Sequence, residues 1–151
     1  MKNGFGEEKT SLYRYIGGWK EGKKCGLGYC KFKDDVEYLG YWKDDKRHGI
    51  GIYKSPEKVI KAEWTADFID GLAHVQAPNK RAVVKKYRKG RLEQLIQKGS
   101  KDFLSKFSAL DFEIFLGFTK KKLDSILSLI RTSKSVIHDN SEISKNELEN
   151  P

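Results

Sequence analysis

The chain has 151 residues, of which 38% are hydrophobic and 34% are charged, so it has room for one domain or for a small domain with an appendage. No apolar run approaches the ~20 residues that span a bilayer, and the first residues, MKNGFGEEK, lack the apolar segment of a secretory signal. The chain has only two cysteines, Cys25 in an expected turn and Cys30 on the following strand. They predict free thiols in a reducing compartment. We therefore expect a cytoplasmic protein with no metal or cofactor site.

A repeated pattern of aromatic residues and glycines begins near the N-terminus. The first full copy reads YIGGWKEGKKCGLGY from residue 15, and the second reads YLGYWKDDKRHGIGIY from residue 38, a displacement of 23. A fainter copy keeps Trp64 and Gly71 at a displacement of 22, and fragments remain at Gly4, Gly6 and Tyr87. A single ligand-binding loop would not recur in this way. The pattern predicts an array of about three to four repeats over residues 1–92, with the first and last units incomplete.

The spacing within each unit predicts a β-hairpin. In Tyr-x-Gly-x-Trp the interval of two places the three side chains on one face of a strand. The run KEGKK then supplies the bend, with Gly22 free to adopt positive φ. Gly26 and Gly28 leave slots in which rings of a neighbouring unit are expected to lie. Stacking buries the aromatic face, so we expect a mainly β fold, a curved single-layer sheet of stacked antiparallel hairpins.

The expected stacking core consists of the aromatic residues and glycines at equivalent positions of the units. They are Tyr15, Gly17, Trp19, Gly26, Gly28, Tyr38, Gly40, Trp42, Gly49, Gly51, Trp64, Gly71 and Tyr87. His48 is expected to be a turn residue and not a catalyst, because no second histidine or carboxylate recurs with it. We therefore expect no catalytic residue.

The net charge of +9 lies in residues 1–92, which hold 21 basic and 12 acidic residues, whereas residues 93–151 hold nine of each. The stretch KRAVVKKYRKGR carries basic residues without an acid: Lys80, Arg81, Lys85, Lys86, Arg88, Lys89 and Arg91. Two interpretations stay open, a solvated strand edge that discourages sheet aggregation or a footprint for an acidic partner such as an anionic membrane or a cytoskeletal polymer. Nucleic acid is the least expected partner, because the pattern matches no nucleic-acid-binding fold.

Past Leu92 glycine nearly vanishes and apolar residues take a helical period. Residues 93–137 are predicted to form a helical segment that caps the last hairpin or binds a partner. The residues of its apolar stripe are Phe103, Phe107, Leu123, Ile126, Leu127 and Ile130. Residues 138–151 are polar and aperiodic, and we expect them to be disordered unless bound.

The repeat pattern resembles the MORN repeat family, in which Tyr-x-Gly-x-Trp is followed by a glycine-bearing turn and by His-Gly-x-Gly. His48-Gly49-Ile50-Gly51 matches the last element fully, whereas Cys25 and Asp70 replace the histidine in the other copies. The resemblance covers about residues 2–92. It implies a hairpin array of the kind found in cilium and cell-cortex scaffolds. Some similar proteins append lipid-kinase or SET methyltransferase domains, and neither is visible in this sequence.

From the resemblance we expect a non-enzymatic adaptor within a larger cytoskeletal assembly, in the cytoplasm and associated with the cytoskeleton, with a cilium or axoneme as one setting. The alternative is a peripheral membrane module that binds anionic phospholipids through residues 80–91. The C-terminal helices and the N-terminal sheet edge are the expected docking places. At that edge, Gly4 and Gly6 supply only the returning half of a hairpin, so a partner could add a strand there. Fraying of residues 1–12 is the other outcome.

Overall fold

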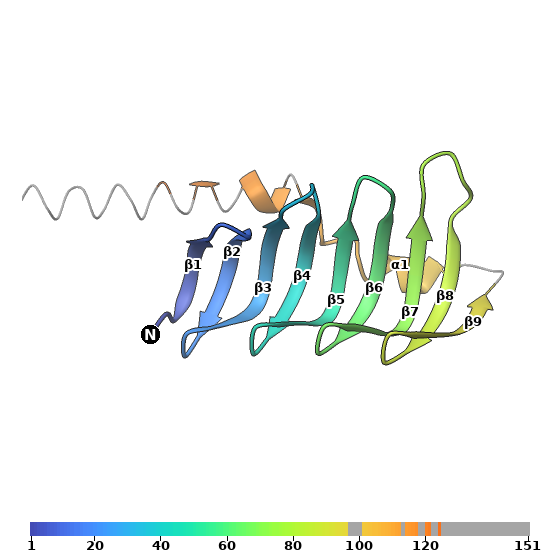
Figure 1. The fold of residues 1–151 in the computed structure, drawn as a ribbon, viewed down its shortest axis with the longest axis horizontal. Helices are drawn as coiled ribbons and strands as arrows, with labels where there is room; N and C mark the ends of the chain where they lie inside the picture. Colours follow the sequence, from blue (N-terminus) through green and yellow to red (C-terminus); the bar gives the residue numbers. More distant parts are fainter. Residues whose placement is uncertain (97–100, 113, 118–119, 122–123, 125–151) are drawn as a thin grey trace, which may run out of the picture. The chain divides into compact units, whose positions relative to one another are not determined.

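The repeat region forms one open, curved sheet of nine strands. The computed structural model describes residues 1–96, 101–112, 114–117, 120–121 and 124. The strands are β1 (Gly4–Lys9), β2 (Tyr13–Lys20), β3 (Lys23–Phe32), β4 (Glu37–Lys43), β5 (Lys46–Lys54), β6 (Val59–Thr65), β7 (Phe68–Gln76), β8 (Val83–Arg88) and β9 (Arg91–Ile96). They lie side by side in chain order, with β1 and β9 at the two edges (Figure 1). Every neighbouring pair is antiparallel, which confirms the predicted array of stacked hairpins.

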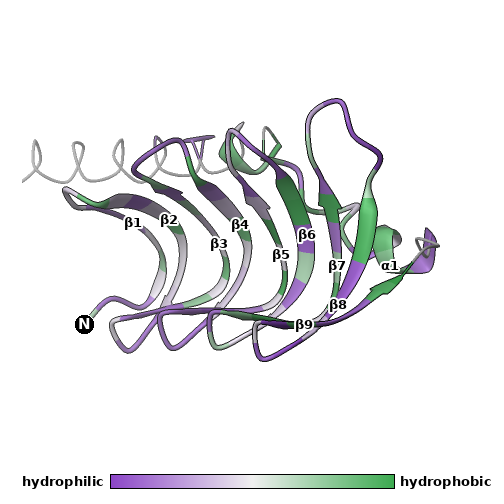
Figure 2. Ribbon diagram, turned by 45° about the vertical axis from the view of Figure 1, so that its right-hand side comes forward, coloured by the Kyte–Doolittle hydropathy of each residue, from purple (hydrophilic) through white to green (hydrophobic). Residues whose placement is uncertain are grey.

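Two-residue turns join the strands within each hairpin, between β2 and β3, β4 and β5, β6 and β7, and β8 and β9. Both residues of every such turn have positive φ, from 47° at Lys89 to 79° at Gly90. This is the geometry of type I′ turns, whose twist matches the right-handed twist of the flanking strands. All four turns lie along one side of the sheet and are hydrophilic (Figures 1 and 2). We call this side the tight-turn edge.

The strand register places small residues and aromatic residues in rows on one face of the sheet, which we call the aromatic face. Gly17 pairs with Gly28, Gly28 with Gly40, Gly40 with Gly51, and Gly51 with Ala62. The core beside this row includes Tyr15, Trp19, Tyr38, Trp42 and Trp64, with Tyr87 packed against it. The first five of these rings are buried and Tyr87 is partly buried, because each hairpin covers part of the next.

Tyr15 and Tyr38, the buried tyrosines of the aromatic face, each lie over two glycines of their own hairpin. A Cβ at Gly28 would be 2.6 Å from Cε2 of Tyr15, and a Cβ at Gly51 would be 2.5 Å from Cε2 of Tyr38. The prediction that these slots hold rings of a neighbouring unit is therefore wrong for the tyrosines. The reason is that Tyr15 and Gly28 lie diagonally across β2 and β3 on the same face, two residue pairs apart in the register, so the ring reaches the glycine directly.

The tryptophans link each hairpin to the preceding strand. The indole Nε1 of Trp42 donates to the carbonyl oxygen of Gly28 at 3.2 Å, and that of Trp64 donates to Gly51 at 3.3 Å. Each indole also meets the neighbouring tyrosine rings edge to face, with centroid distances of 5.2–5.6 Å. The aromatic face therefore joins successive units through both ring contacts and buried hydrogen bonds.

Gly26 and Gly49 do not form ring slots, in contrast to the sequence prediction. A Cβ at Gly26 would meet nothing within 4 Å, and the residue has φ 75°. Gly49 has φ 78° and lies where the register of β4 and β5 shifts, since three residues of β5 oppose one residue of β4. Both glycines are required for the positive φ of a bulge and not for space.

The opposite face of the sheet, which we call the aliphatic face, carries a second buried layer. Ile16, Tyr29, Leu39, Ile52 and Val84 are all buried. The first four are paired across successive strands, which places them on this face. Successive side chains of a strand point to opposite faces of the sheet. The two faces therefore have different compositions.

The segment after the sheet packs on the aliphatic face. The short helix α1 (Lys101–Ser105) and the turns that follow bury Phe103, Phe107 and Leu110. The ring of Phe112 meets that of Tyr29 edge to face at 6.1 Å, and Lys106 forms an ion pair of 3.1 Å with Glu63. Tyr29 belongs to β3 and Glu63 to β6. The segment therefore covers part of the aliphatic face at β3 and β6, and the expected cap on the last hairpin stays a prediction.

The array extends four residues past the predicted boundary at residue 92, because β9 ends at Ile96. The spacing of Leu92, Leu95 and Ile96 fits a helix, but the turn at Lys89 and Gly90 returns the chain onto β8. The chain divides into two compact units, residues 1–115 and 116–151. The predicted stripe residues Leu123, Ile126, Leu127 and Ile130, and the predicted disordered tail 138–151, lie outside the described residues.

Two smaller predictions are also corrected. His48 lies in β5 and Cys25 lies in β3, so neither is a turn residue. A type I′ turn needs only two residues. The strands after the turns, β3 and β5, therefore begin before Cys25 and His48. Both cysteines are free, as predicted, with Cys30 buried and Cys25 partly exposed.

The two thiols are expected to differ in reactivity. Burial raises the pKa of Cys30 to about 12, although Lys24 and Arg47 act in the opposite direction. At pH 8 the thiolate of Cys30 is scarce and shielded, so iodoacetamide is expected to modify Cys25 at least about tenfold faster. Peptide mass spectrometry of the native protein measures both rates, and denatured protein serves as the control. Equal native rates would show that Cys30 is accessible.

Candidate functional site

A cavity of about 420 Å³ opens on the aromatic face between β2 and β5, and we call it the aromatic groove. Its aromatic wall is formed by Tyr13, Phe32, Trp42 and Tyr53. Its charged lining consists of Lys24, Arg47, Asp45 and Asp67. Cys30 and Val36 complete it, and every lining residue belongs to the sheet or its connections. The volume lies within the range of ligand-binding pockets in proteins, about 300–1,000 Å³.

Lys24 occupies the first of two equivalent positions in the groove. It follows the first tight turn and is paired with Trp19 across the hairpin. Its side chain is buried among rings, with Nζ 4.3 Å from the ring centroid of Tyr13 and 5.8 Å from that of Trp19. Nζ donates a hydrogen bond of 3.0 Å to the Tyr13 hydroxyl, which in turn donates to the Glu8 carboxylate. Lys24 therefore lies in a cation–π environment with one hydroxyl partner.

Arg47 occupies the second of these positions, paired with Trp42 in the next hairpin. Its guanidinium lies 4.5 Å from the ring of Trp64 and 5.9 Å from that of Tyr38. Unlike Lys24, it has an acidic partner, because Nε is 3.0 Å from Oδ1 of Asp67. A second nitrogen donates to the Asp67 carbonyl oxygen at 3.2 Å. The groove thus holds one neutralised cation beside one that has no carboxylate in contact.

The aspartates of the tight turns connect each turn to the preceding hairpin. Oδ1 of Asp45 accepts the backbone N–H of Lys24 at 2.8 Å, and Oδ1 of Asp67 accepts that of Arg47 at 2.9 Å. The backbone returns the contact, since the N–H of Asp45 donates to the Lys24 carbonyl at 3.2 Å. Asn3 makes the corresponding side-chain contact with Glu21 at 2.8 Å. These bonds fix the end of the groove nearest the tight-turn edge.

Comparison with known families agrees with this geometry. A family model described as MORN repeat matches residues 15–35 and 38–58, the two hairpins whose strands frame the groove. This chain contains two MORN repeats. Among curated proteins, none matches the chain. MORN repeats are non-catalytic modules that generally mediate protein–protein or membrane–lipid interactions.

The four charged residues of the aromatic groove were not predicted from the sequence, and neither were Tyr13, Phe32, Val36 and Tyr53 of its lining. The charged residues are Lys24, Arg47, Asp45 and Asp67. A signal was present, because the basic residue recurs at a displacement of 23 and the aspartate at a displacement of 22. Among 30 basic residues, however, nothing in the sequence distinguishes the two that the rings enclose. Burial of these two depends on the strand register, which brings the next hairpin's tryptophan over each side chain.

Several titratable groups of the array have shifted pKa values. The Lys2 ammonium, and after it the Tyr13 hydroxyl, lowers the pKa of Glu8, so this carboxylate stays charged. Burial raises the pKa of Tyr15 and of Tyr38 above the ordinary value, so both hydroxyls stay neutral. Burial also lowers the pKa of His74. Within the described part of the chain, no group of three or more His, Cys, Asp or Glu residues could hold a metal ion.

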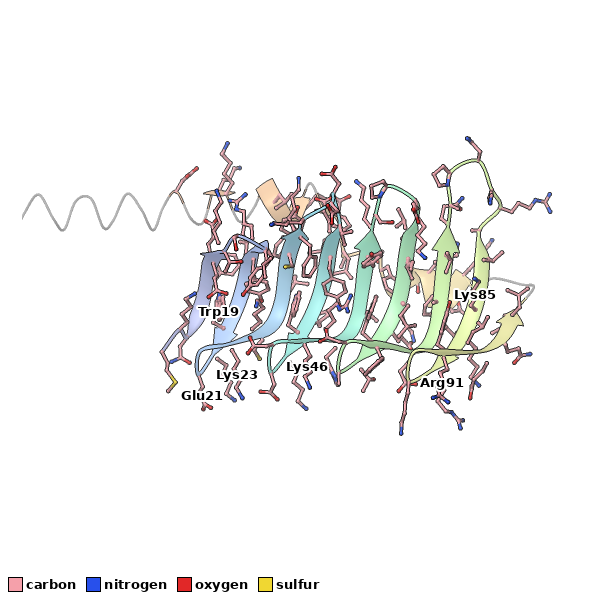
Figure 3. The ribbon with its side chains drawn as sticks, in the orientation of Figure 1. Trp19, Glu21, Lys23, Lys46, Lys85 and Arg91 are labelled. Carbon is pink, nitrogen blue, oxygen red and sulfur yellow. The ribbon has the colours of Figure 1, made fainter. Side chains whose placement is uncertain are left out.

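The predicted basic footprint is not one surface. Lys80 and Arg81 lie in the connection between β7 and β8, at the end of the strands opposite the tight-turn edge. Lys85 is half-buried midway along β8, paired with Ala73 of the small-residue row (Figure 3). Lys86 follows it on the other face. Arg88, Lys89 and Arg91 lie at the tight-turn edge, with Arg88 in an ion pair of 3.0 Å with Glu93. Strand alternation and the length of β8 separate these charges.

The tight-turn edge itself carries a row of basic residues. Three hairpins place like charges directly opposite each other where the turn closes: Lys20 and Lys23, Lys43 and Lys46, and Arg88 and Arg91. All six residues are exposed, and Lys23, Lys46 and Arg91 extend away from the sheet (Figure 3). The remaining hairpin places Phe68 there, 57% exposed. Opposed like charges are destabilising, so this row is a second candidate interaction surface.

Proposed function

We propose that this MORN-repeat protein is a non-enzymatic adaptor that binds partner proteins through the aromatic groove within a larger cytoskeletal assembly. The observation that carries the proposal is the groove, a cavity with a wall of aromatic rings and two cations, lined by the sheet and its connections. Aromatic residues with polar ends are typical of the centres of protein interfaces. A cilium, axoneme or cell-cortex setting in the cytoplasm is proposed from the resemblance to other MORN proteins.

The shape of the groove suits an extended segment. Its lining runs along the strands, from Asp45 and Asp67 at the tight-turn edge to Phe32 and Val36 at the other end. The strand β4 between these ends has seven residues, which span roughly 23 Å. A partner segment of about six residues could therefore lie along the groove, with alternate side chains facing the aromatic wall.

Site-specific photo-crosslinking in the native cell tests the proposal. A benzoylphenylalanine at Tyr53, in the groove, is expected to form an adduct with one defined partner protein, which then appears in the detergent-resistant cytoskeletal fraction. The matched control is the same group at Tyr41, which is 44% exposed on the aliphatic face. Adducts of the same protein from both positions, or none from Tyr53, would contradict docking in the groove.

The alternative function is binding to anionic membranes, and the basic row at the tight-turn edge favours it. In the described part of the chain no helix is long and apolar enough to cross a bilayer. Contact would instead be peripheral, with each basic residue near an anionic surface contributing ~1 kcal/mol. The exposed ring of Phe68 could enter the headgroup region beside the lysines.

Co-sedimentation with phosphatidylserine vesicles tests the alternative. If the row binds lipid, replacing Lys20, Lys23, Lys43 and Lys46 by glutamate is expected to abolish co-sedimentation, and added salt should weaken the wild-type interaction because charges are screened beyond ~8 Å. The comparison variant reverses Lys80, Arg81, Lys85 and Lys86, which belong to the basic stretch but lie away from the tight-turn edge. If only this variant loses co-sedimentation, the basic stretch is the lipid site. Co-sedimentation that is insensitive to salt and to both reversals would exclude an electrostatic membrane site.

A further inference from the structure

We propose that Lys24 is the specificity residue of the aromatic groove, where its ammonium receives a carboxylate side chain from an extended segment of a partner protein. The inference rests on the proposed function of the groove and adds the chemistry of the bound segment. That segment must place one Asp or Glu over the middle of the groove, flanked by side chains that pack on Tyr13, Phe32 and Tyr53.

The first reason is that Lys24 is buried without a carboxylate in contact. It is 9% exposed and is the buried charged residue of the described core. None of the ion pairs among the described residues involves it. Of the three N–H donors of the ammonium, one is used, toward the Tyr13 hydroxyl. Burying an ammonium costs free energy unless a counter-charge accompanies it.

The carboxylate that the Tyr13 hydroxyl contacts is already shared. Glu8 accepts a hydrogen bond from Tyr13 and forms an ion pair of 2.7 Å with Lys2. It therefore reaches Lys24 only through the Tyr13 hydroxyl, while a second cation contacts it directly. Asp45, the other acid nearby, has Oδ1 on the backbone N–H of Lys24 and not on its ammonium. Neither carboxylate neutralises Lys24 directly.

The equivalent residue of the next hairpin shows what the fold supplies elsewhere. Arg47 has the same relation to Trp42 that Lys24 has to Trp19, and the next turn again supplies an aspartate. There the aspartate, Asp67, binds both the backbone and the guanidinium. At Lys24 the corresponding contact with the side chain is missing. The two repeats thus differ at this position, and Lys24 lines the open groove without a carboxylate in contact.

The surroundings favour a peptide carboxylate over a membrane. Lys24 is recessed between the rings of Tyr13 and Trp42, where a flat bilayer surface could not reach its ammonium. Asp45 and Asp67 at the end of the groove disfavour a doubly charged phosphate more than a singly charged carboxylate. A single carboxylate on an extended segment fits both the depth and the charge.

The three tryptophans provide the readout, because Trp19 and Trp42 flank Lys24 and Trp64 flanks Arg47. The indole N–H signals of the full ¹⁵N-labelled chain are followed during titration with capped hexapeptide pools. One pool has Glu fixed at the third position among randomised uncharged residues, and the other has Gln there. The Glu pool is expected to bind at least about tenfold more tightly and to shift the signals of Trp19 and Trp42, as for a charge-assisted hydrogen bond in a partly buried site.

Variants assign the preference to Lys24. Lys24→Met keeps much of the volume and should remove the preference for Glu, whereas Lys24→Arg should retain it. Lys31→Met removes the same charge from an exposed position on the aliphatic face and should change nothing. The dispersion of the three indole signals shows in each case that the chain is folded.

Each outcome bears on a distinct claim. Equal binding of the two pools would overturn the inference and leave the groove as a peptide site. Preference for Glu that persists in Lys24→Met would place the recognition elsewhere. Phosphatidylserine vesicles that shift Trp19 and Trp42 when neither peptide pool does would replace the peptide with a lipid surface. Binding of neither pool and no vesicle effect would also reject the inference, while the crosslinks at Tyr53 decide the proposed function separately.

Discussion

Replacing Trp42 by alanine is expected to lower the free energy of unfolding by about 3–5 kcal/mol, as truncation of buried aromatic residues does. Trp42 is 6% exposed and contacts Tyr15 and Tyr38 edge to face. It also donates to the carbonyl of Gly28, which the substitution would leave buried without its partner. Because the residue joins two hairpins, its loss is expected to separate the array at its middle. Thermal and urea unfolding followed by circular dichroism measure the change.

The control is the neighbouring residue on the other face. Tyr41→Ala removes an aromatic side chain of similar size that is 44% exposed, and it is expected to change stability by less than about 1 kcal/mol. For a chain of this length, the Trp42 variant should lower the midpoint by about 10 °C or more and the control by a few degrees. A Trp42→Ala midpoint within two degrees of the wild type would show that the ring does not carry the stack.

Gly51→Ala is expected to destabilise the protein by about 3 kcal/mol, the upper end of the range for overpacking a core. A Cβ at Gly51 would lie 2.5 Å from Cε2 of Tyr38, a ring that is fully buried and held between two tryptophans. The ring cannot move aside without disturbing both. Gly49→Ala, two residues earlier, is expected to cost only about 1 kcal/mol, since its Cβ has room and the cost comes from φ 78°. Urea unfolding of both variants measures the difference.

A double-mutant cycle separates the two causes. In a Tyr38→Leu background the ring no longer fills the slot, so the cost of Gly51→Ala is expected to fall by at least about 1 kcal/mol, whereas the cost of Gly49→Ala should not change. Equal costs of Gly51→Ala in both backgrounds would show that the glycine is needed for backbone reasons alone.

The two glycines of one Gly-x-Gly motif therefore serve different purposes, although the motif itself does not distinguish them. A repeat that replaces the second glycine with a small residue can still stack, as the third hairpin does with Ala62 and Ala73 in the row. Both alanines are fully buried, and the third unit has no tyrosine at the equivalent of Tyr38, where Ile60 stands instead. Without the large ring, the space over this row can hold the Cβ atoms of alanines.

The sequence by itself determined the repeat architecture of the chain. The displacements of 23 and 22 between Tyr-x-Gly-x-Trp units, and the interval of two within each unit, were sufficient to predict hairpins with one aromatic face. This worked because the stack is quasi-one-dimensional: each ring contacts residues of its own hairpin or of the next one, so the contacts are encoded within about 25 residues.

The tertiary structure alone decided the features that depend on register and on distant segments. The bulges give Gly26 and Gly49 a different role from Gly28 and Gly51, and the rings of two hairpins together bury Lys24. The contacts of Phe112 with Tyr29 and of Lys106 with Glu63 on the aliphatic face depend on a segment far from β3 and β6 in the sequence. The basic stretch was contiguous in sequence and divided in space, because a strand directs successive side chains to opposite faces and separates its two ends.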